Sequence, residues 1–483
     1  MITFYISLAI LIAGYFLYGK LCERIFGADK NRKTPAIKNA DGVDFIVLPN
    51  WKIFLIQFLN IAGLGPVFGA IMGAKFGSAS FLWIVFGCIF AGAMHDYFAG
   101  MISLRNNGEG LPTTIGRYLG KNAQFVIRIF TIILLVIVGA VFTSGPANLL
   151  AVLTPEYLDA TFWLYIIFAY YVIATLFPIN KIIGKIYPIF GFALLFMALG
   201  IMGYLVIKNP NIPEINESFR NMNPNPEANP IFPMMFVSIA CGAISGFHAT
   251  QSPLMARCMK NEKQGRPIFF GAMITEGIVA LIWAAAATYF FSPEGQEAFG
   301  ITDNSINSNA ATITNIISHN WLGITGGFLA ILGVIAAPIS TGDTALRSAR
   351  LIVADFLKVE QKSLKKRLAI SIPLFAITIA ILLFSLLDKN GFEIIWRYFA
   401  WSNQVLAVFT LWAISVFLMR ERSGWWWILS FVPALFMTSM TTTFILFSPV
   451  GAGLSYTLSV ALSLIISSFC GILFIKKTHK NRL

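Results

Sequence analysis

The polar side chains best suited to chemistry lie inside stretches that are otherwise apolar. The segment 241–253 contains His248, with Ser245 and Gln251 close to it, together with two glycines and a proline. The surrounding run, 231–255, is long enough to cross a bilayer. Irregular backbone at membrane depth persists only against protein or a water-filled cavity. We therefore predict a broken helix that lines the path of a solute, with substrate contacts at Ser245, His248 and Gln251.

A second span holds a comparable interruption. Within 53–74, Asn60 is followed by Gly63, Gly65 and Pro66. Paired segments interrupted by glycine and proline indicate the binding site of a secondary transporter, where half-helix N-termini hold an anion and freed carbonyls hold a cation. We predict substrate contacts at Asn60, Gly63 and Gly65. Close helix packing is the alternative, because glycine and proline are common in membrane helices.

Ionisable residues inside a span are functional candidates, because a charge is costly to bury in a bilayer. His95 and Asp96 lie in the run 78–104, and Glu276 lies in the run 267–291. The first two could relay protons, and Glu276 could carry a coupling proton. A structural role, in which a neighbouring helix satisfies each side chain, is equally compatible with the sequence.

Hard oxygen donors gather at the end of the run 321–340. Ser340, Thr341 and Asp343 offer hydroxyls and a carboxylate, which suit Na⁺ or a proton rather than a soft metal. The alternative is that the span ends here and that Asp343 caps an amphipathic helix over 346–357.

Another polar group stands in the run 393–418. Ser402, Asn403 and Gln404 follow an aromatic stretch that is typical of the outer membrane interface. These side chains could point into the bundle, where Asn403 would contact the solute, or they could bridge neighbouring helices.

The elements that must position these groups are membrane-spanning helices. The 483 residues are 57% hydrophobic and 12% charged, whereas a soluble domain has about 25% charged residues. We predict an all-α polytopic membrane protein with about thirteen spans. They are expected near 2–20, 53–74, 78–104, 123–144, 161–179, 186–207, 231–255, 267–291, 321–340, 368–387, 393–418, 425–447 and 454–475.

The net charge of +13 comes from lysines and arginines that concentrate in alternate loops. Such loops face the cytoplasm, so we predict an N-terminus outside and a C-terminus inside. Contact with anionic lipid explains the basic excess without a nucleic-acid partner. The five cysteines form no C-x-x-C pair, so no disulfide framework, zinc site or cofactor is predicted, apart from a coupling H⁺ or Na⁺.

The two interrupted spans are five spans apart and cross in opposite directions. This predicts two inverted five-helix repeats, 53–207 and 231–418. An extra span at 1–22 precedes them, and two extra spans with a basic cytoplasmic tail, 425–483, follow them.

Several of these segments resemble the carbon starvation protein A family. The most specific is SGFHATQSPLMARC at 245–258. Similar matches are GAMHDYF at 92–98, TEGIVALIWA at 275–284, DTALRSAR at 343–350 and WRYFAWSNQ at 396–404.

The resemblance implies a bacterial inner-membrane carrier that takes up peptides or, in related members, pyruvate when carbon is scarce. It also implies the amino acid–polyamine–organocation fold, the LeuT-like arrangement of inverted repeats, with helices unwound at 62–66 and 242–248. In many such carriers a cation lies between the first broken helix and the eighth core helix. Here this places Ser340, Thr341 and Asp343 opposite carbonyls near Ala62 and Gly65.

The resulting hypothesis is ion-coupled import by alternating access. The substrate carboxylate is expected on amides near Gly63, Gly65 and Gly246, with His248, Gln251 and Asn403 orienting it. A channel or a transport-like sensor stays open, as does an intramembrane serine hydrolase built on Ser245 and His248, although no enzyme is predicted. The substrate, the coupling ion and the oligomeric state are not determined by the sequence.

Overall fold

The computed structural model describes residues 1–176, 183–303, 306–307, 309–361, 363–387 and 391–479. The end of the predicted span 161–179, the basic residues Lys181 and Lys389, and the tail from 480 lie outside this range.

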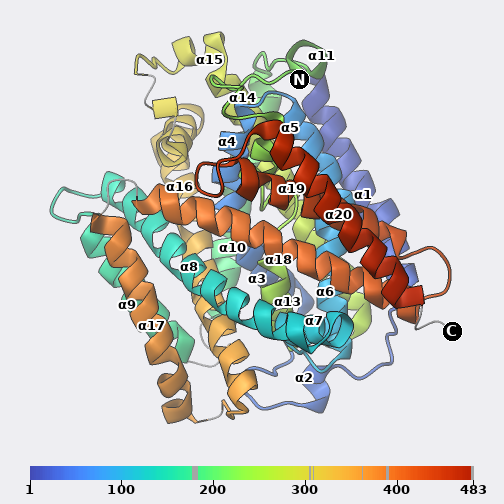
Figure 1. Ribbon diagram of the computed structural model, residues 1–483. Helices are drawn as coiled ribbons and strands as arrows, with labels where there is room; N and C mark the ends of the chain where they lie inside the picture. Colours follow the sequence, from blue (N-terminus) through green and yellow to red (C-terminus); the bar gives the residue numbers. More distant parts are fainter. Residues whose placement is uncertain (177–182, 304–305, 308, 362, 388–390, 480–483) are drawn as a thin grey trace.

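All regular elements in the described residues are helical (Figure 1). The α-helices are α1 (Ile2–Phe26), α2 (Pro35–Lys38), α3 (Asn50–Ile61), α4 (Ala70–Ala74), α5 (Ala79–Leu82), α6 (Met94–Arg105), α7 (Leu111–Leu119), α8 (Lys121–Leu153), α9 (Ala160–Leu176), α10 (Ile183–Lys208), α11 (Ile215–Ser218), α12 (Phe236–Ser238), α13 (His248–Ala256), α14 (Gly271–Phe291), α15 (Pro293–Ala298), α16 (Ala310–Leu357), α17 (Leu364–Leu387), α18 (Gly391–Glu421), α19 (Ile428–Phe447) and α20 (Tyr456–His479). Shorter π-helical segments are Gly65–Gly69, Trp83–Ala93, Ile231–Met235 and Arg266–Phe270.

Ten helices among the described residues are long and apolar enough to cross a membrane. The multi-pass membrane class predicted from the sequence is therefore supported. The other three predicted spans have different forms. Asn50–Ile61 and Gly65–Ala74 are a pair bent by 54°, and the described part of α9 has 17 residues. The run 231–255 is split between Ile231–Met235, α12 and α13.

Both predicted interruptions are present. The first helix stops at Ile61 and resumes at Gly65, where Pro66 has no backbone N–H to donate. The second run is non-helical between α12 and α13. Glycine is required where the breaks pack closely, because a Cβ on Gly65 would lie 2.2 Å from the Cβ of Cys241.

The course of helix α16 excludes the alternative in which the span ends before Asp343. It has 48 residues and continues through Asp343 to Leu357, with its one non-helical residue at Gly323, where φ is 68°. Asp343 is therefore inside a helix, and the N-cap role considered for it is wrong. The helix persists because Ala337 to Leu346 packs in the protein interior, which the local sequence does not reveal.

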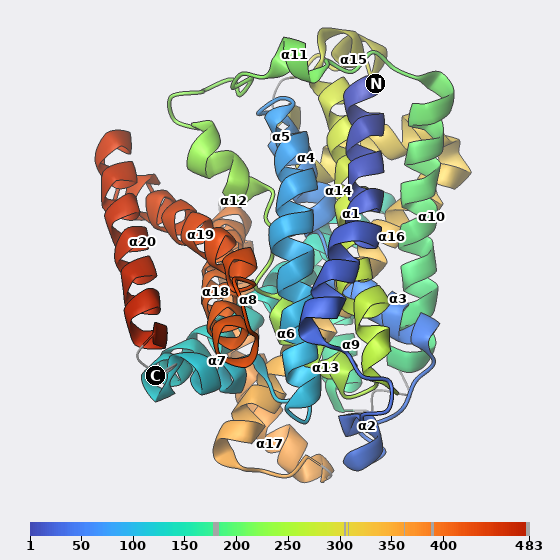
Figure 2. The same cartoon turned by 90° about the vertical axis from the view of Figure 1, so that its right-hand side faces the viewer.

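Helix α16 packs most extensively against α8 and α10. Helix α13 packs against α6 and α3, and α14 packs against α1. Figure 2 shows α19 and α20 standing together at one side of the molecule, with the N-terminus at the end that carries α11 and α15. The proposed boundaries of the two repeats stay a prediction.

Candidate functional site

The two helix breaks meet in the interior. A Cβ on Gly65 would collide with the Cβ of Cys241, and a Cβ on Gly69 would lie 2.7 Å from the carbonyl oxygen of Ser238. A Cβ on Gly63 would lie 3.4 Å from the hydroxyl of Thr341. Segments almost 180 residues apart in sequence thus form one buried centre.

Asn403 of α18 fixes the second break, which is the non-helical segment 239–247 between α12 and α13. Its Oδ1 accepts hydrogen bonds from the backbone N–H of Phe247 at 2.6 Å and from the Ser245 hydroxyl at 3.0 Å. Its backbone carbonyl accepts the N–H of Gly246 at 3.1 Å. The predicted group of Ser245, Gly246 and Asn403 is therefore brought together, but the Gly246 amide expected to hold a carboxylate is engaged with Asn403 in this conformation.

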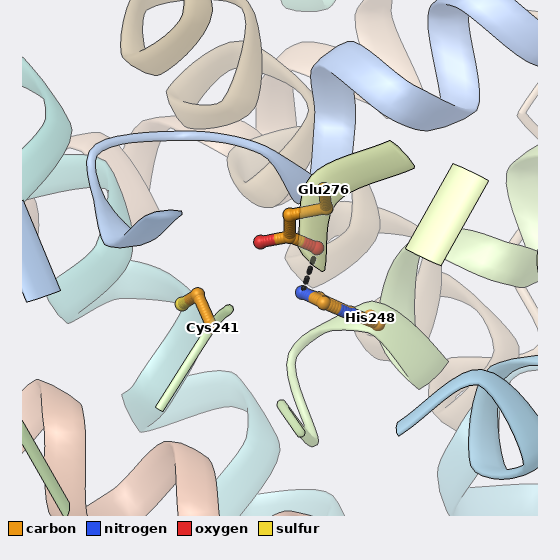
Figure 3. Close-up of side chains that lie close together, drawn as sticks. All are labelled: Cys241, His248 and Glu276. Atoms are coloured by element: carbon orange, nitrogen blue, oxygen red, sulfur yellow. Dashed lines mark ion pairs between the residues drawn. The ribbon is translucent and has the colours of Figure 1, made fainter. Parts of the chain in front are cut away.

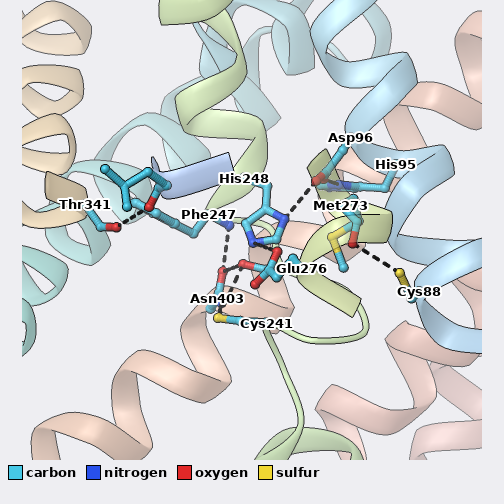
Figure 4. Close-up of polar contacts among 12 residues, drawn as sticks. Cys88, His95, Asp96, Cys241, Phe247, His248, Met273, Glu276, Thr341 and Asn403 are labelled. Atoms are coloured by element: carbon cyan, nitrogen blue, oxygen red, sulfur yellow. Dashed lines mark hydrogen bonds and ion pairs between the residues drawn. The ribbon is translucent and has the colours of Figure 1, made fainter. Parts of the chain in front are cut away.

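A chain of charged and ionisable side chains crosses the same centre (Figure 4). Asp96 contacts His95 Nδ1 through Oδ1 and His248 Nδ1 through Oδ2, both at 2.8 Å. His248 Nε2 lies 3.4 Å from Oε2 of Glu276. All four side chains are fully buried. The adjacent side chains of His95 and Asp96 are in contact, and α6, α13 and α14 each contribute to the chain.

These contacts weigh against a serine nucleophile. The hydroxyl of Ser245 donates to Asn403, while the ring nitrogens of His248 face Asp96 and Glu276. A serine hydrolase needs the hydroxyl within hydrogen-bond reach of its base, and the contacts described for Ser245 and His248 do not pair them.

Several buried polar groups on the broken helices and on α14 have no hydrogen-bond partner among the described residues. They include both side-chain polar atoms of Asn60 and of Gln57, Oε1 of Gln251 and both oxygens of Glu276. A buried polar group without a partner costs roughly 1–3 kcal/mol, so these atoms are suited to meet a solute. Gln57 was not predicted as a site residue from the sequence, although it lies three residues before Asn60 and therefore on the same helix face.

The side chains of the three predicted cation ligands have different hydrogen-bond partners in the structure. The Thr341 hydroxyl lies 3.1 Å from the carbonyl oxygen of Leu59, next to the first break. Ser340 donates to the carbonyl of Ala337 within its own helix. Asp343 instead accepts a hydrogen bond from the Tyr187 hydroxyl. The Thr341 hydroxyl also lies 2.9 Å from the Ala337 carbonyl of its own helix. Among the hydrogen bonds described for these three side chains, the contact of Thr341 with Leu59 is the one that reaches the first broken helix.

A basic cluster that the sequence did not reveal lies on α16 beyond these ligands. Nη1 of Arg347 is 3.7 Å and Nη2 of Arg350 is 3.9 Å from Oδ1 of Asp44. All three side chains are almost completely buried. Their contact joins the segment that precedes α3 to α16.

The sequence pattern described as "Carbon starvation protein CstA" matches residues 1–156, 151–325 and 295–444. The chain belongs to this family.

Some relatives of this chain are named as transporters. The peptide transporter CstA of Campylobacter jejuni is 26% identical, over 90% of this chain and 78% of its own length. The pyruvate/proton symporter BtsT of Escherichia coli is also 26% identical, over 61% of this chain and 51% of its own length. An uncharacterised membrane protein of Haemophilus influenzae is 42% identical, over 60% of this chain and 91% of its own length.

A solved structure shares the fold. The manganese transporter of Eremococcus coleocola, in complex with an aromatic bis-isothiourea substituted compound, aligns with a TM-score of 0.54. The alignment covers 91% of this chain and 99% of that one, at 12% identity. At this identity the likeness concerns the arrangement of helices alone.

Proposed function

We propose that this protein is a secondary active transporter that imports small carboxylate-bearing nutrients, peptides or pyruvate, when carbon is scarce. The observation that carries the proposal is the meeting of two broken helices around buried polar groups without partners, notably Asn60 and Gln57. The relatives named as peptide and pyruvate transporters support the substrate class.

The proposal includes a topology. Thirteen spans cross a bacterial inner membrane with the N-terminus outside and the C-terminus inside, as the basic loops indicate. Two LeuT-like inverted repeats, 53–207 and 231–418, each begin with a broken helix. The 54° bend of the first pair is of the kind that such a repeat requires.

The substrate carboxylate is held between the two breaks. The amide groups of Gln57 and Asn60 provide neutral donors, and α13 directs its N-terminus toward the same centre, where its dipole favours an anion. His248 and Gln251 stand in the first turn of that helix. Asn403 keeps the break open by supplying the hydrogen bonds that the helix would otherwise make.

Coupling uses H⁺ or Na⁺. Glu276 is fully buried and has no hydrogen bond to its oxygens in the described part of the chain, so a positively charged ion beside it would be stabilised. The Thr341 hydroxyl and the carbonyl of Leu59 offer a second position, suited to Na⁺, with Ser340 and Asp343 behind it. Movement of one charge through 100 mV supplies about 2.3 kcal/mol.

Transport proceeds by alternating access. The pieces of the broken helices rock about their non-helical segments, so that the buried centre opens to one side at a time. The contact of Asp44 with Arg347 and Arg350 holds the segment before α3 against α16, and it must separate when that side opens.

Uptake into proteoliposomes tests the proposal. Labelled pyruvate, dipeptides and tripeptides are offered with an inward proton gradient, an inward sodium gradient or neither. We expect saturable accumulation of one solute class that needs one of the two gradients. Asn60→Ala should reduce it about tenfold or more, as the loss of a ligand contact of about 1.4 kcal/mol predicts, whereas Asn320→Ala on the exposed face of α16 should not. Flux that neither saturates nor depends on a gradient would indicate a channel and contradict the proposal.

A further inference from the structure

Three side chains with metal-binding atoms converge at the second break (Figure 3). Cys241 stands near the start of the non-helical segment, His248 begins α13, and Glu276 projects from α14. Their ligand atoms all lie within 4.8 Å of one another. His248 and Glu276 are fully buried and Cys241 is 4% exposed, so bulk water does not solvate the set.

The distance between His248 and Glu276 fits coordination better than a hydrogen bond. Nε2 and Oε2 are 3.4 Å apart, beyond the usual range of an N–H···O bond. Two ligand atoms at about 2.0–2.1 Å from a tetrahedral metal ion stand roughly 3.3 Å apart. Nε2 and both Glu276 oxygens also have no hydrogen-bond partner among the described residues.

The surrounding contacts orient these groups as they are oriented in metal sites. A histidine that binds a metal through one ring nitrogen usually donates the other to a carboxylate. Nδ1 of His248 lies 2.8 Å from Asp96, which leaves the lone pair of Nε2 directed at Glu276. Asn403 Nδ2 donates to the sulfur of Cys241 at 3.7 Å, a contact that would stabilise a thiolate.

We infer that Cys241, His248 and Glu276 bind a transition metal ion of the Zn²⁺ class. A thiolate, an imidazole and a carboxylate select Zn²⁺ or Co²⁺ over Na⁺ or Mg²⁺. Binding releases the thiol proton of Cys241, so the thiolate and the Glu276 carboxylate neutralise the two charges of the ion. Three protein ligands leave a fourth position for water or for the carboxylate of a small molecule.

Metal binding can be measured without transport, although His248 and Glu276 also belong to the proposed substrate and coupling site. One ion would join the second break to α14 and hold them together, so Zn²⁺ should slow movements that separate them. This consequence alone rests on the proposed function. Loss of metal binding would therefore leave the transporter proposal standing, and loss of transport would leave the metal site standing.

The test uses the full chain in detergent, produced in medium in which Co²⁺ replaces zinc and then washed free of loose metal. We expect about one cobalt per chain, as one closed set of three ligands predicts, and a thiolate-to-cobalt absorption band in the near ultraviolet. Cys241→Ser should abolish the band and weaken binding at least tenfold. Cys88→Ser is the matched control, because Cys88 is an equally buried thiol whose sulfur donates to the carbonyl of Met273.

X-ray absorption at the cobalt edge of the unmodified chain provides a measurement that needs no variant. We expect one sulfur at about 2.3 Å and nitrogen or oxygen ligands at about 2.0–2.2 Å. Three results would overturn the inference: a folded chain that retains no cobalt, bound cobalt without a sulfur ligand, or a thiolate band that survives in Cys241→Ser.

Discussion

Oδ2 of Asp96 lies 2.8 Å from Nδ1 of His248, and this contact joins α6 to the first turn of α13 across 152 positions of the sequence. The same carboxylate contacts His95 through its other oxygen. Asp96 therefore fixes the ring of His248, which in turn presents Nε2 to Glu276. Through these contacts Asp96 positions His248 and Glu276 at the second break.

Asp96→Asn should impair coupled transport more than folding. The amide keeps the size of the side chain but loses a charge-assisted hydrogen bond worth about 1.5–3 kcal/mol, so gradient-driven accumulation should fall about 10- to 100-fold. Exchange of substrate between equal concentrations should persist, because it needs no net movement of the coupling ion. Glu227→Gln, an exposed carboxylate-to-amide change, is the control. An equal loss of exchange and accumulation, with a lower unfolding temperature, would assign Asp96 a purely structural role.

Gly65→Ala should disrupt the junction of the two breaks. The new Cβ would lie 2.2 Å from the Cβ of Cys241, and such overpacking costs about 1–3 kcal/mol. Uptake should fall at least tenfold and the unfolding temperature should drop. Gly203→Ala is the matched control, since nothing lies within 4 Å of a Cβ there. If the two variants behave alike, the breaks do not pack as described.

Thr341→Val should weaken the contact between α16 and the first broken helix. The change removes a hydroxyl that lies 3.1 Å from the Leu59 carbonyl and leaves that oxygen to be satisfied elsewhere, at a cost of about 1–3 kcal/mol. We expect at least a fivefold loss of uptake, and a higher half-saturating sodium concentration where sodium drives transport. Thr344→Val removes a hydroxyl whose hydrogen bonds, in the described part of the chain, go to carbonyls of its own helix, and it should leave uptake close to normal. Equal effects of the two variants would exclude the first break as the reason.

Glu214 should make the start of α1 sensitive to acid. Its carboxylate accepts the backbone N–H groups of Ile2 and Thr3, each at 2.7 Å. Burial opposes ionisation, but hydrogen bonds from the amino group of Met1, from Thr3 and from Ile2 outweigh it and lower the pKa of Glu214 from 4.5 to about 2. Because the folded pKa is the lower one, this stabilisation is present above about pH 4.5 and is lost as the pH falls toward 2.

Hydrogen exchange of the Ile2 and Thr3 amides measures this effect. Glu214→Gln should speed their exchange at neutral pH by several fold, as the loss of a helix cap worth about 1 kcal/mol predicts. The difference from the unmodified chain should shrink below about pH 4.5 and vanish near the folded pKa. A difference that stays constant from pH 7 to pH 2 would contradict the ionised carboxylate as the cause.

Much of the candidate site was visible before the structure, and its pairings were not. The polar residues Asn60, His248, Glu276 and Asn403 stand out because they interrupt apolar runs. The sequence did not show that Asp343 turns to Tyr187, because a helix of 48 residues carries that side chain past the expected end of the span. The metal-binding set was missed for a similar reason, since its three ligands are not arranged in any local motif.

The sequence by itself determined the membrane class, the all-helical composition and the two interruptions. Each depends on local physics: apolar length against bilayer thickness, and glycine and proline against the helical hydrogen-bond ladder. Only the tertiary structure decided that Asn403 holds the second break and that Asp96 reaches His248. Those contacts join residues more than 150 positions apart, and helical periodicity fixes which face of a helix a residue occupies without fixing which helix lies opposite it.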